Sequence, residues 1–400
     1  MCNSILLVVC IQLLFVRKTL AIRGELYEGS QCTLENGDSG VCKKLLDCQT
    51  RLMDVQQGKR SSDSSGRCGF DGFIEIVCCP MDDVVKVQPR LADIACEEYT
   101  SVSTAVKLNQ NRRTSNELVY HVYGGTPANT TEYPFVVALG YENNNREEDP
   151  SPTRYSCGGS LISPEHVLTA AHCVNNINKQ VPIEVRLGNE DLRSTAANVQ
   201  RIPVSDIISH PKYKRTSNYN DVAILKLKRK VQLTDTVKPV CLQTKPLPNL
   251  NTVRVASRTS FLVIGWGATN FGDDNSDKLM KTHELSIVSR EECNRFYSGF
   301  PRLSRGIDEN LICVIDTNSS RRSDACTGDS GGPLLMSTEN GRSVIGITSF
   351  GQSCGSSAPG VYTAVYSYLS WIEEQVWATK NFLNFRSAFN DTEPDDVHAH

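Results

Sequence analysis

The sequence lacks an apolar run long enough to cross a bilayer and lacks a strong excess of either charge. Its apolar run at 5–16 covers 12 residues, whereas a membrane-spanning helix needs about 20. The formal net charge is −3, and the basic run at 226–230 and the acidic run at 146–149 are both short. We therefore expect no membrane partner and no nucleic-acid partner. The length of 400 residues predicts more than one domain.

Residues 1–21 are typical of a secretory signal peptide. The apolar run is followed by Thr19 and Ala21, small residues of the kind that precede signal-peptidase cleavage. A buried helix is the alternative, but the position at the start of the chain favours a signal. Three sequons are candidate glycosylation sites, at Asn129, Asn318 and Asn390. These features predict a secreted, extracellular protein.

Cysteines support the same compartment and divide the chain. There are 16, and 14 remain once Cys2 and Cys10 of the predicted signal peptide are set aside. An even number in an extracellular chain predicts disulfides. Residues 31–80 have few large apolar side chains, so disulfides must supply much of their stability. A zinc site is the alternative there, but the spacing lacks paired Cys-x-x-Cys units. The cysteines of this segment are Cys32, Cys42, Cys48, Cys68, Cys78 and Cys79.

Residues 81–121 are polar, have little periodicity and are predicted to be a linker. Their single cysteine, Cys96, needs a distant partner. Cys241 is the best candidate, because the other six downstream cysteines look self-sufficient. Such a disulfide would keep the linker attached to the second module even if the chain were cut between them.

From residue 122 the pattern changes to short alternating apolar runs bounded by Gly, Pro and Asn. This pattern predicts an all-β barrel or sandwich. A helix closes the domain, because Leu369, Ile372 and Val376 are spaced at i, i+3 and i+7. Residues 377–400 have no sustained pattern and are predicted to be a loose tail. The runs include EYPFVVALGY, IEVRLGN, DVAILKLK, FLVIGWG, HELSIVS, NLICVI, RSVIGITSFG and GVYTAV.

Three motifs carry residues suited to nucleophilic catalysis. In DACTGDSGGP, Ser330 is flanked by glycines, so a sharp turn can expose its hydroxyl and converge the nearby amides. LTAAHC offers His172 as a base, and YNDVAILKL offers Asp221 as its carboxylate partner. Each has a structural alternative: a simple turn, a core histidine and a strand-start cap. Their joint occurrence in the order His, Asp, Ser favours a catalytic triad.

Residues 122–376 resemble a trypsin-like serine protease of the chymotrypsin fold, through VYGG, LTAAHC, NDVAILKL, GWG, TGDSGGP and PGVYT. Residues 31–80, with their final adjacent cysteines, resemble the clip domain of arthropod clip-domain serine proteases. The resemblance implies an all-β, chymotrypsin-like double β-barrel with a C-terminal helix, preceded by a small disulfide-rich clip domain. It also implies the disulfides Cys32–Cys78, Cys42–Cys68, Cys48–Cys79, Cys96–Cys241, Cys157–Cys173, Cys293–Cys313 and Cys326–Cys354.

The resemblance also assigns roles to single residues. Ser330 would attack the carbonyl, His172 would move the proton and Asp221 would hold the imidazole, supported by Ser349. The amides of Gly328 and Ser330 would form the oxyanion hole. Asp324 would form the base of the primary pocket, which predicts cleavage after Arg or Lys over a chymotrypsin-like preference. Gly351 and Gly360 would line its walls.

Two departures from the family pattern concern a disulfide and a metal. Phe261 and Met336 occupy positions that often form another disulfide, so a packed contact is expected in its place. Asn189 and Val199 stand where trypsins carry calcium-binding acids, so we expect no metal there. No cofactor is implied.

In this family the zymogen is cut just before VYGG, and the new ammonium of Val122 pairs with Asp329. His121 precedes the cut, and a pocket built on Asp324 should accept histidine poorly. We therefore expect an upstream activating protease, a downstream protease zymogen as substrate, and serpin inhibitors, in an arthropod haemolymph cascade of melanisation or Toll type. A cut at Arg112-Arg113 would leave the terminus eight residues too early. A binding-only pseudoprotease and a digestive protease are the alternatives.

Overall fold

The structure is a computed structural model in which the chain divides into two compact units between Pro89 and Arg90. The predicted signal peptide, the predicted activation bond between His121 and Val122, and Asn390 lie outside the described residues. No helix within the described segments is long and apolar enough to cross a membrane. The structure describes residues 26–56, 59, 66–71, 74–81, 89–104, 125–144, 151–175, 180–247, 259–268, 275–339 and 341–378.

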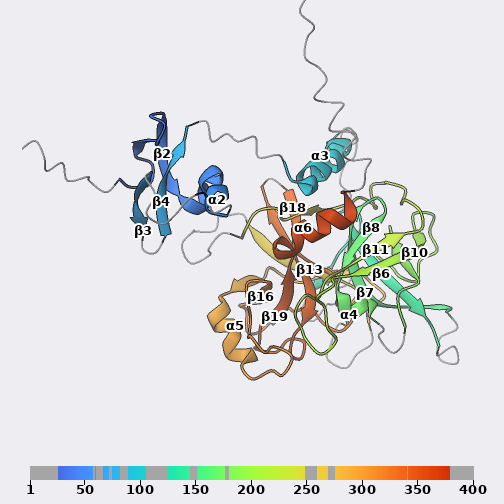
Figure 1. The fold of residues 1–400 in the computed structure, drawn as a ribbon. Coiled ribbons are helices and arrows are strands. Elements are labelled where there is room, and N and C mark those ends of the chain that lie inside the picture. Colours follow the sequence, from blue (N-terminus) through green and yellow to red (C-terminus); the bar gives the residue numbers. More distant parts are fainter. Residues whose placement is uncertain are drawn as a thin grey trace, which may run out of the picture. The chain divides into compact units, whose positions relative to one another are not determined.

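The N-terminal unit is a small antiparallel sheet with the strand order β1-β2-β4-β3 (Figure 1). Its buried clusters consist mainly of half-cystines, with Ile76 and Val77 as the large aliphatic side chains. Disulfides therefore replace most of an apolar core, as the composition predicts. The elements are β1 (Gln31–Thr33), β2 (Ser39–Lys44), the 3-10 helix η1 (Leu45–Asp47), α2 (Gln49–Gln56), β3 (Arg67–Asp71) and β4 (Ile74–Pro80).

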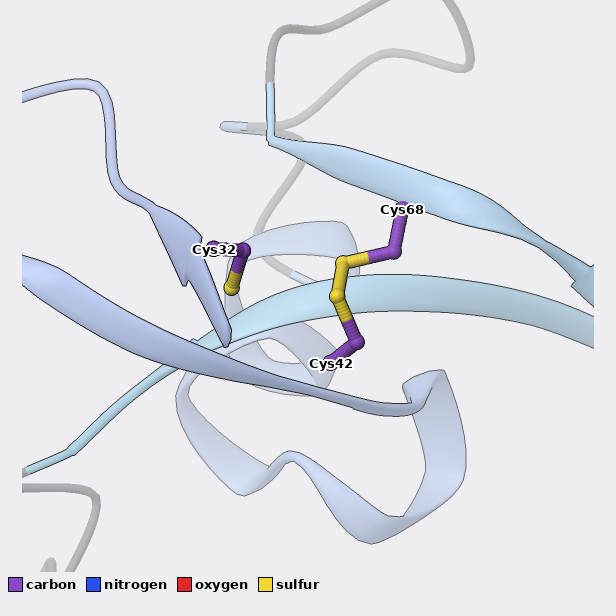
Figure 2. A group of neighbouring side chains, drawn as sticks. All are labelled: Cys32, Cys42 and Cys68. Carbon is purple, nitrogen blue, oxygen red and sulfur yellow. A yellow bond between two sulfur atoms is a disulfide. The ribbon is translucent and has the colours of Figure 1, made fainter. Parts of the chain in front are cut away.

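The adjacent cysteines at the end of β4 point to opposite faces of the sheet, because side chains alternate along a strand. Cys78 bonds to Cys32, and Cys79 bonds to Cys48. Cys32 also lies beside the Cys42–Cys68 disulfide (Figure 2). All of these sulfurs are in disulfides, so they offer no thiolate to a zinc ion.

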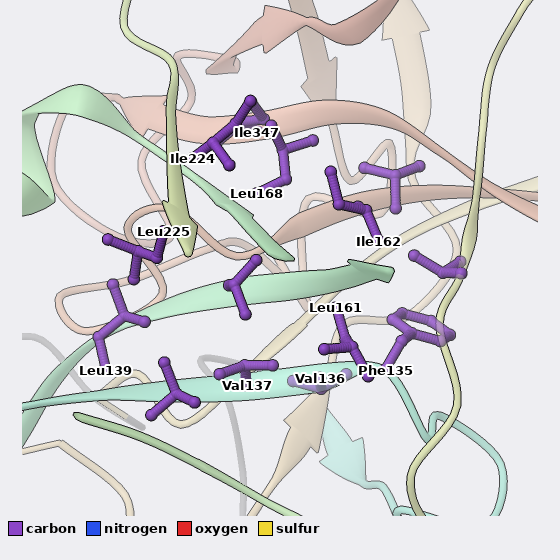
Figure 3. Close-up of a cluster of buried hydrophobic side chains, with 14 of the residues drawn as sticks. Phe135, Val136, Val137, Leu139, Leu161, Ile162, Leu168, Ile224, Leu225 and Ile347 are labelled. Carbon is purple, nitrogen blue, oxygen red and sulfur yellow. The ribbon is translucent and has the colours of Figure 1, made fainter. Parts of the chain in front are cut away.

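The second unit contains a closed six-stranded barrel with the order β10-β11-β8-β7-β6-β9. Its apolar runs are buried: in β11, for example, only Lys226 is exposed. Figure 3 shows part of the resulting core, in which Ile347 from the second sheet lies beside Leu168 and Ile224 of the barrel. The strands are β6 (Val136–Glu142), β7 (Thr153–Ser163), β8 (His166–Thr169), β9 (Glu184–Leu187), β10 (Gln200–Ser209) and β11 (Ala223–Leu227).

The remaining strands form a second sheet with the order β15-β16-β19-β18-β17-β13-β14-β5, and β12 pairs with β18. Phe261 and Met336 are direct partners on β13 and β17 and pack in one apolar cluster. This contact occupies the place of the missing disulfide. The strands are β5 (Thr126–Pro127), β12 (Cys241–Leu242), β13 (Ser260–Gly265), β14 (Met280–Lys281), β15 (Ser286–Val288), β16 (Leu311–Ile315), β17 (Pro333–Thr338), β18 (Gly341–Phe350) and β19 (Gly360–Ala364).

Helices in this unit are α3 (Leu91–Thr104), α4 (Ala171–Val174), α5 (Arg290–Tyr297) and α6 (Val365–Val376). In α6, Leu369, Ile372 and Val376 are buried, as their spacing predicts. Helix α5 was not predicted, although its N-cap is visible in the sequence. The hydroxyl of Ser289 accepts a hydrogen bond from the Glu292 amide, which is the start of a capping box.

Helix α3 lies within the segment 81–121 that the sequence predicts to be a linker. It packs on the rest of the second unit through the buried side chains of Ala92 and Ala95 and through the Cys96–Cys241 disulfide. Thr244 also donates a hydrogen bond to Asp93 (2.7 Å). The fully buried residues of α3 are small, and Leu91 and Tyr99 pack beside them only partly buried, so the apolar stripe is weak in the sequence. Part of the segment is therefore ordered structure of the second unit.

Candidate active site

His172 lies on the short helix α4, directly after barrel strand β8. The Cys157–Cys173 disulfide ties this helix to β7, and the Tyr141 hydroxyl donates to the Cys173 carbonyl (2.8 Å). The His172 side chain remains 29% exposed, so it is both held in place and accessible. Its Nδ1 bonds to Asp221 Oδ2 at 2.8 Å.

Asp221 lies just before β11 and is buried between the two sheets of the second unit. Its Oδ1 accepts from the His172 amide (2.8 Å), and its Oδ2 also accepts from the Ser349 hydroxyl (2.5 Å). The Thr363 hydroxyl donates to the Asp221 carbonyl (3.0 Å). The preceding residue, Asn220, has a φ of 57°, so a left-handed turn directs the carboxylate inward.

His172 and Asp221 shift each other's pKa values in opposite directions. Burial raises the pKa of Asp221, but the charge and hydrogen bonds of His172, with the Ser349 bond, hold that pKa below its ordinary value. Burial lowers the pKa of His172, but the Asp221 charge and hydrogen bond outweigh it and raise the pKa. The pair therefore favours an ionised carboxylate beside an imidazole that accepts a proton readily.

Ser330 occupies a turn that joins the two sheets of the second unit. Its carbonyl accepts from the Gly158 amide of β7 (2.8 Å), and the Gly331 amide donates to Thr348 of β18 (2.8 Å). Gly331 has a φ of 77° and lies against Thr169, where a side chain would collide. Ser330 thus lies next to the segment that carries His172. Its hydroxyl makes no hydrogen bond within the described part of the chain.

The amides of Gly328 and Ser330 also donate to no acceptor within the described residues. Gly328 has a φ of 98°, which favours glycine. Unpaired amides close to a nucleophile can stabilise a developing oxyanion. Within the described residues, the two amides predicted for the oxyanion hole have no competing acceptor.

Asp324 lies beside the two glycines that the sequence predicts for the pocket wall. A methyl group built on Gly360 would lie 3.2 Å from Asp324 Oδ1, and one built on Gly351 would lie 3.9 Å from the Gly360 Cα. Burial raises the pKa of Asp324 to about 7, against hydrogen bonds from the Ala325 and Gly355 amides. No cation among the described residues compensates this carboxylate.

Asp329 is a second buried carboxylate without a cation among the described residues. Its oxygens accept from the amides of Gly267 (2.8 Å) and Cys326 (2.9 Å). Burial nevertheless raises its pKa to about 6. A side chain on Gly265 or Gly267 would collide with its carboxylate, which explains the glycines of the GWG motif.

The loop that binds calcium in trypsins is held here by protein groups. Asn189 donates to Asn198 (3.1 Å), and the buried guanidinium of Arg186 donates to the carbonyls of Asp191 (3.1 Å) and Ser194 (2.6 Å). Elsewhere among the described residues, the close groups of potential metal ligands contain disulfide-bonded cysteines.

The seven disulfides of the described residues are the pairs that the clip-protease resemblance implies. They are Cys32–Cys78, Cys42–Cys68, Cys48–Cys79, Cys96–Cys241, Cys157–Cys173, Cys293–Cys313 and Cys326–Cys354. Of the sequons, Asn129 and Asn318 are exposed.

The fold and this site define a serine endopeptidase of the trypsin family, and the chain belongs to that family: its model, Trypsin, matches residues 122–372. Serine protease snk of Drosophila melanogaster is 35% identical over 87% of this chain and 79% of that protein. CLIP domain-containing serine protease B4 of Anopheles gambiae is 30% identical over 91% and 98%, respectively. Phenoloxidase-activating enzyme 1 of Spodoptera litura is 30% identical over 86% and 93%. The predicted kinship with arthropod clip-domain serine proteases is confirmed.

Proposed function

We propose that this chain is the secreted zymogen of a trypsin-like endopeptidase that is cut after His121 and then cleaves a downstream zymogen after Arg or Lys. The observation that carries the proposal is the pair of buried carboxylates, Asp324 and Asp329, each without a cation among the described residues. A buried charge needs a counter-ion. A substrate Arg or Lys would supply the counter-ion of Asp324, and the new N-terminus at Val122 would supply that of Asp329.

In the proposed mechanism, Ser330 Oγ attacks the substrate carbonyl while His172 takes its proton and later gives it to the leaving amine. Asp221 keeps the proton of neutral His172 on Nδ1, so that Nε2 faces the serine. The amides of Gly328 and Ser330 bind the oxyanion, and losing one such donor typically costs ~3 kcal/mol of transition-state stabilisation.

The specificity follows from the pocket. Gly360 borders the buried Asp324 carboxylate and Gly351 borders Gly360, so we expect the absence of side chains at both positions to leave room for a long substrate side chain. An Arg or Lys entering the pocket would neutralise that carboxylate, whereas Phe would leave it uncompensated. Arg and Lys are therefore favoured over an aromatic residue.

The activation switch is supported by strand pairing. β5 pairs with β14, and β14 pairs with β13, whose Gly265 lies against Asp329. Two strand spacings are about 10 Å. The three residues Val122 to Gly124 also span about 10 Å when extended. A terminus at Val122 could therefore reach Asp329, and one created eight residues earlier would not fit the same site.

His121 makes self-activation inefficient, so an upstream protease is needed and the enzyme belongs in a cascade. The kinship with a phenoloxidase-activating enzyme supports such a role in haemolymph, with serpins as inhibitors. The disulfides fit an extracellular location, and Asn129, Asn318 and Asn390 are proposed glycan sites.

The test replaces the residues before Val122 by an orthogonal protease site and assays Arg, Lys and Phe peptide amides after the cut. Ser330→Ala is the blank, and His121→Arg in the natural sequence is the matched variant for activation. We expect Arg and Lys hydrolysis only after cutting, and self-activation only in H121R. No activity above the blank, with a verified Val122 terminus, would reject the catalytic proposal in favour of a binding protein.

A further inference from the structure

Two loops beside Asp221 carry exposed cations, which we call the basic rim: Lys212, Lys214, Arg215 and Arg302. The first three follow β10, and Arg302 follows α5. Within the described residues, none of their side chains forms an ion pair or hydrogen bond. The whole chain has a net charge of −3, so the basic rim is a local reversal of sign.

The two loops are joined to each other. The Asn218 amide donates to the Arg302 carbonyl (3.1 Å), and the Tyr219 hydroxyl donates to the Gly306 carbonyl (2.8 Å). Arg305, on the same loop, is not counted in the basic rim, because its guanidinium already has protein partners. It stacks on the Tyr219 ring at 4.0 Å and pairs with Asp308 (2.9 Å).

Tyr213 lies near both the basic rim and Asp221. Burial of its hydroxyl, together with the Asp221 charge, raises its pKa to about 12, and the charges of Arg215 and Arg302 oppose this rise. One half-buried ring therefore lies within electrostatic range of both arginines and of the candidate catalytic carboxylate.

Aromatic contacts connect the predicted pocket residue Gly351 with the loop that carries Arg302. Phe350 directly precedes Gly351 in the sequence. Phe350 packs on Tyr297 (5.7 Å between ring centroids), and Tyr297 packs on Phe300 (5.2 Å), beside the loop of Arg302.

We propose that the basic rim binds carboxylates in the two to four residues that precede the cleaved Arg or Lys. This inference rests on the proposed function, since it concerns the specificity of the same site. Exposed, unpaired arginines can pair with carboxylates without first breaking an internal ion pair. The expected protein substrate therefore has an acidic segment just before its cleavage site.

The experiment compares two peptide amides on the full chain after the engineered cut: acetyl-Glu-Asp-Gly-Arg and its neutral isostere acetyl-Gln-Asn-Gly-Arg. The test variant is Arg215→Gln/Arg302→Gln. The matched control is Lys228→Gln/Lys230→Gln, which removes the same charge from exposed side chains at the end of β11. The acidic-to-neutral ratio of kcat/KM is taken within each enzyme, so a general loss of activity cancels.

At 50 mM salt we expect a ratio of about 10 for the natural chain and the control, and about 1 for R215Q/R302Q. At 0.5 M salt the first two ratios should fall to about 2, because salt screens exposed charges. Clear hydrolysis with a ratio near 1 in the natural chain would overturn this inference and leave the proposed function intact. Hydrolysis of neither peptide would overturn both. A ratio near 1, with heparin-resin binding that R215Q/R302Q loses, would assign the basic rim to a sulfated polysaccharide instead.

Discussion

Arg90 and Glu373 form a two-point ion pair between the start of α3 and the C-terminal helix α6. The distances are 3.2 Å from Nε to Oε1 and 2.8 Å from Nη2 to Oε2. Glu373 Oε1 also accepts from the Ala92 amide (3.1 Å), so one carboxylate satisfies a free donor in the first turn of α3. The Cys96–Cys241 disulfide joins the same helix to β12. The disulfide and the non-covalent contacts with Glu373 thus each hold α3 on the rest of the second unit.

The first prediction is that α3 stays bound without its disulfide. In Cys96→Ser/Cys241→Ser, the fragment ending before Val122 should co-elute with the protease after cutting, because Ala92 and Ala95 remain buried and Arg90 remains paired. Adding Arg90→Ala should weaken retention about tenfold or more, since charged hydrogen bonds contribute about 1.5–3 kcal/mol. Size-exclusion chromatography without reductant measures retention. Immediate loss of the fragment from the cysteine variant alone would contradict the prediction.

The second prediction concerns the pH dependence of hydrolysis by the cut enzyme. His172 is a base only when neutral, and Asp221 raises its pKa, so kcat/KM should fall as the pH drops through that raised value. Asp221→Asn should shift this acidic fall of kcat/KM to lower pH and reduce kcat about 10³–10⁴-fold. Ser349→Ala keeps the charge and should cost about tenfold. If the acidic fall of kcat/KM occurs at the same pH in D221N, the proposed role of Asp221 beside His172 is refuted.

The third prediction compares the stability of uncut and cut chains, both as Ser330→Ala. Burial raises the pKa of Asp329 to about 6 in the uncut chain. An acid with a raised folded pKa stabilises the fold below its unfolded pKa of about 4 and loses that contribution as the pH rises through the folded value. The uncut chain should therefore lose about 2–3 kcal/mol from this group between about pH 4 and 7, at ~1.4 kcal/mol per pKa unit.

In the cut chain, pairing with the Val122 ammonium should remove that loss. The difference in unfolding free energy between cut and uncut chains should then grow by about 2–3 kcal/mol from pH 4 to pH 7, measured by urea titration. Asp329→Asn is the control, in which the difference should not vary with pH. Identical pH profiles for the cut and uncut chains that retain Asp329 would argue against the switch.

The fourth prediction is that the loop 189–199 is stable without calcium. A chelator should shift the melting temperature by less than about 1 °C, because Arg186 already binds the Asp191 and Ser194 carbonyls. Arg186→Met should lower stability by about 2–3 kcal/mol, since two part-buried carbonyls lose a charged donor. A calcium-dependent rise in melting temperature would show that the loop binds the ion.

The parts of this protein that could be predicted are those whose signal is local in sequence. The buried run of β11 and the spacing of Leu369, Ile372 and Val376 each lie within one element. The spacing does not fix the helix boundary: α6 starts at Val365, before Leu369, the first residue of the predicted apolar spacing. Strand β10 was missed because its alternation is weak and several of its outward side chains are polar.

Features that depend on distant contacts could not be predicted. Helix α3 is held by Glu373, 283 residues from Arg90, and its buried residues are small. The basic rim likewise brings Arg215 and Arg302 to one place only through the paired loops. Sequence patterns identify the chemistry of such residues but not their neighbours.

The position of α3 has a practical consequence for exchanging modules among related proteases. The proposed activation bond follows His121, yet α3 belongs to the compact unit that begins at Arg90. A chimera joined at residue 121 would carry a foreign helix, together with a foreign partner for Glu373. A chimera joined between Pro89 and Arg90 would transfer the N-terminal unit and leave the second unit with all of its own parts.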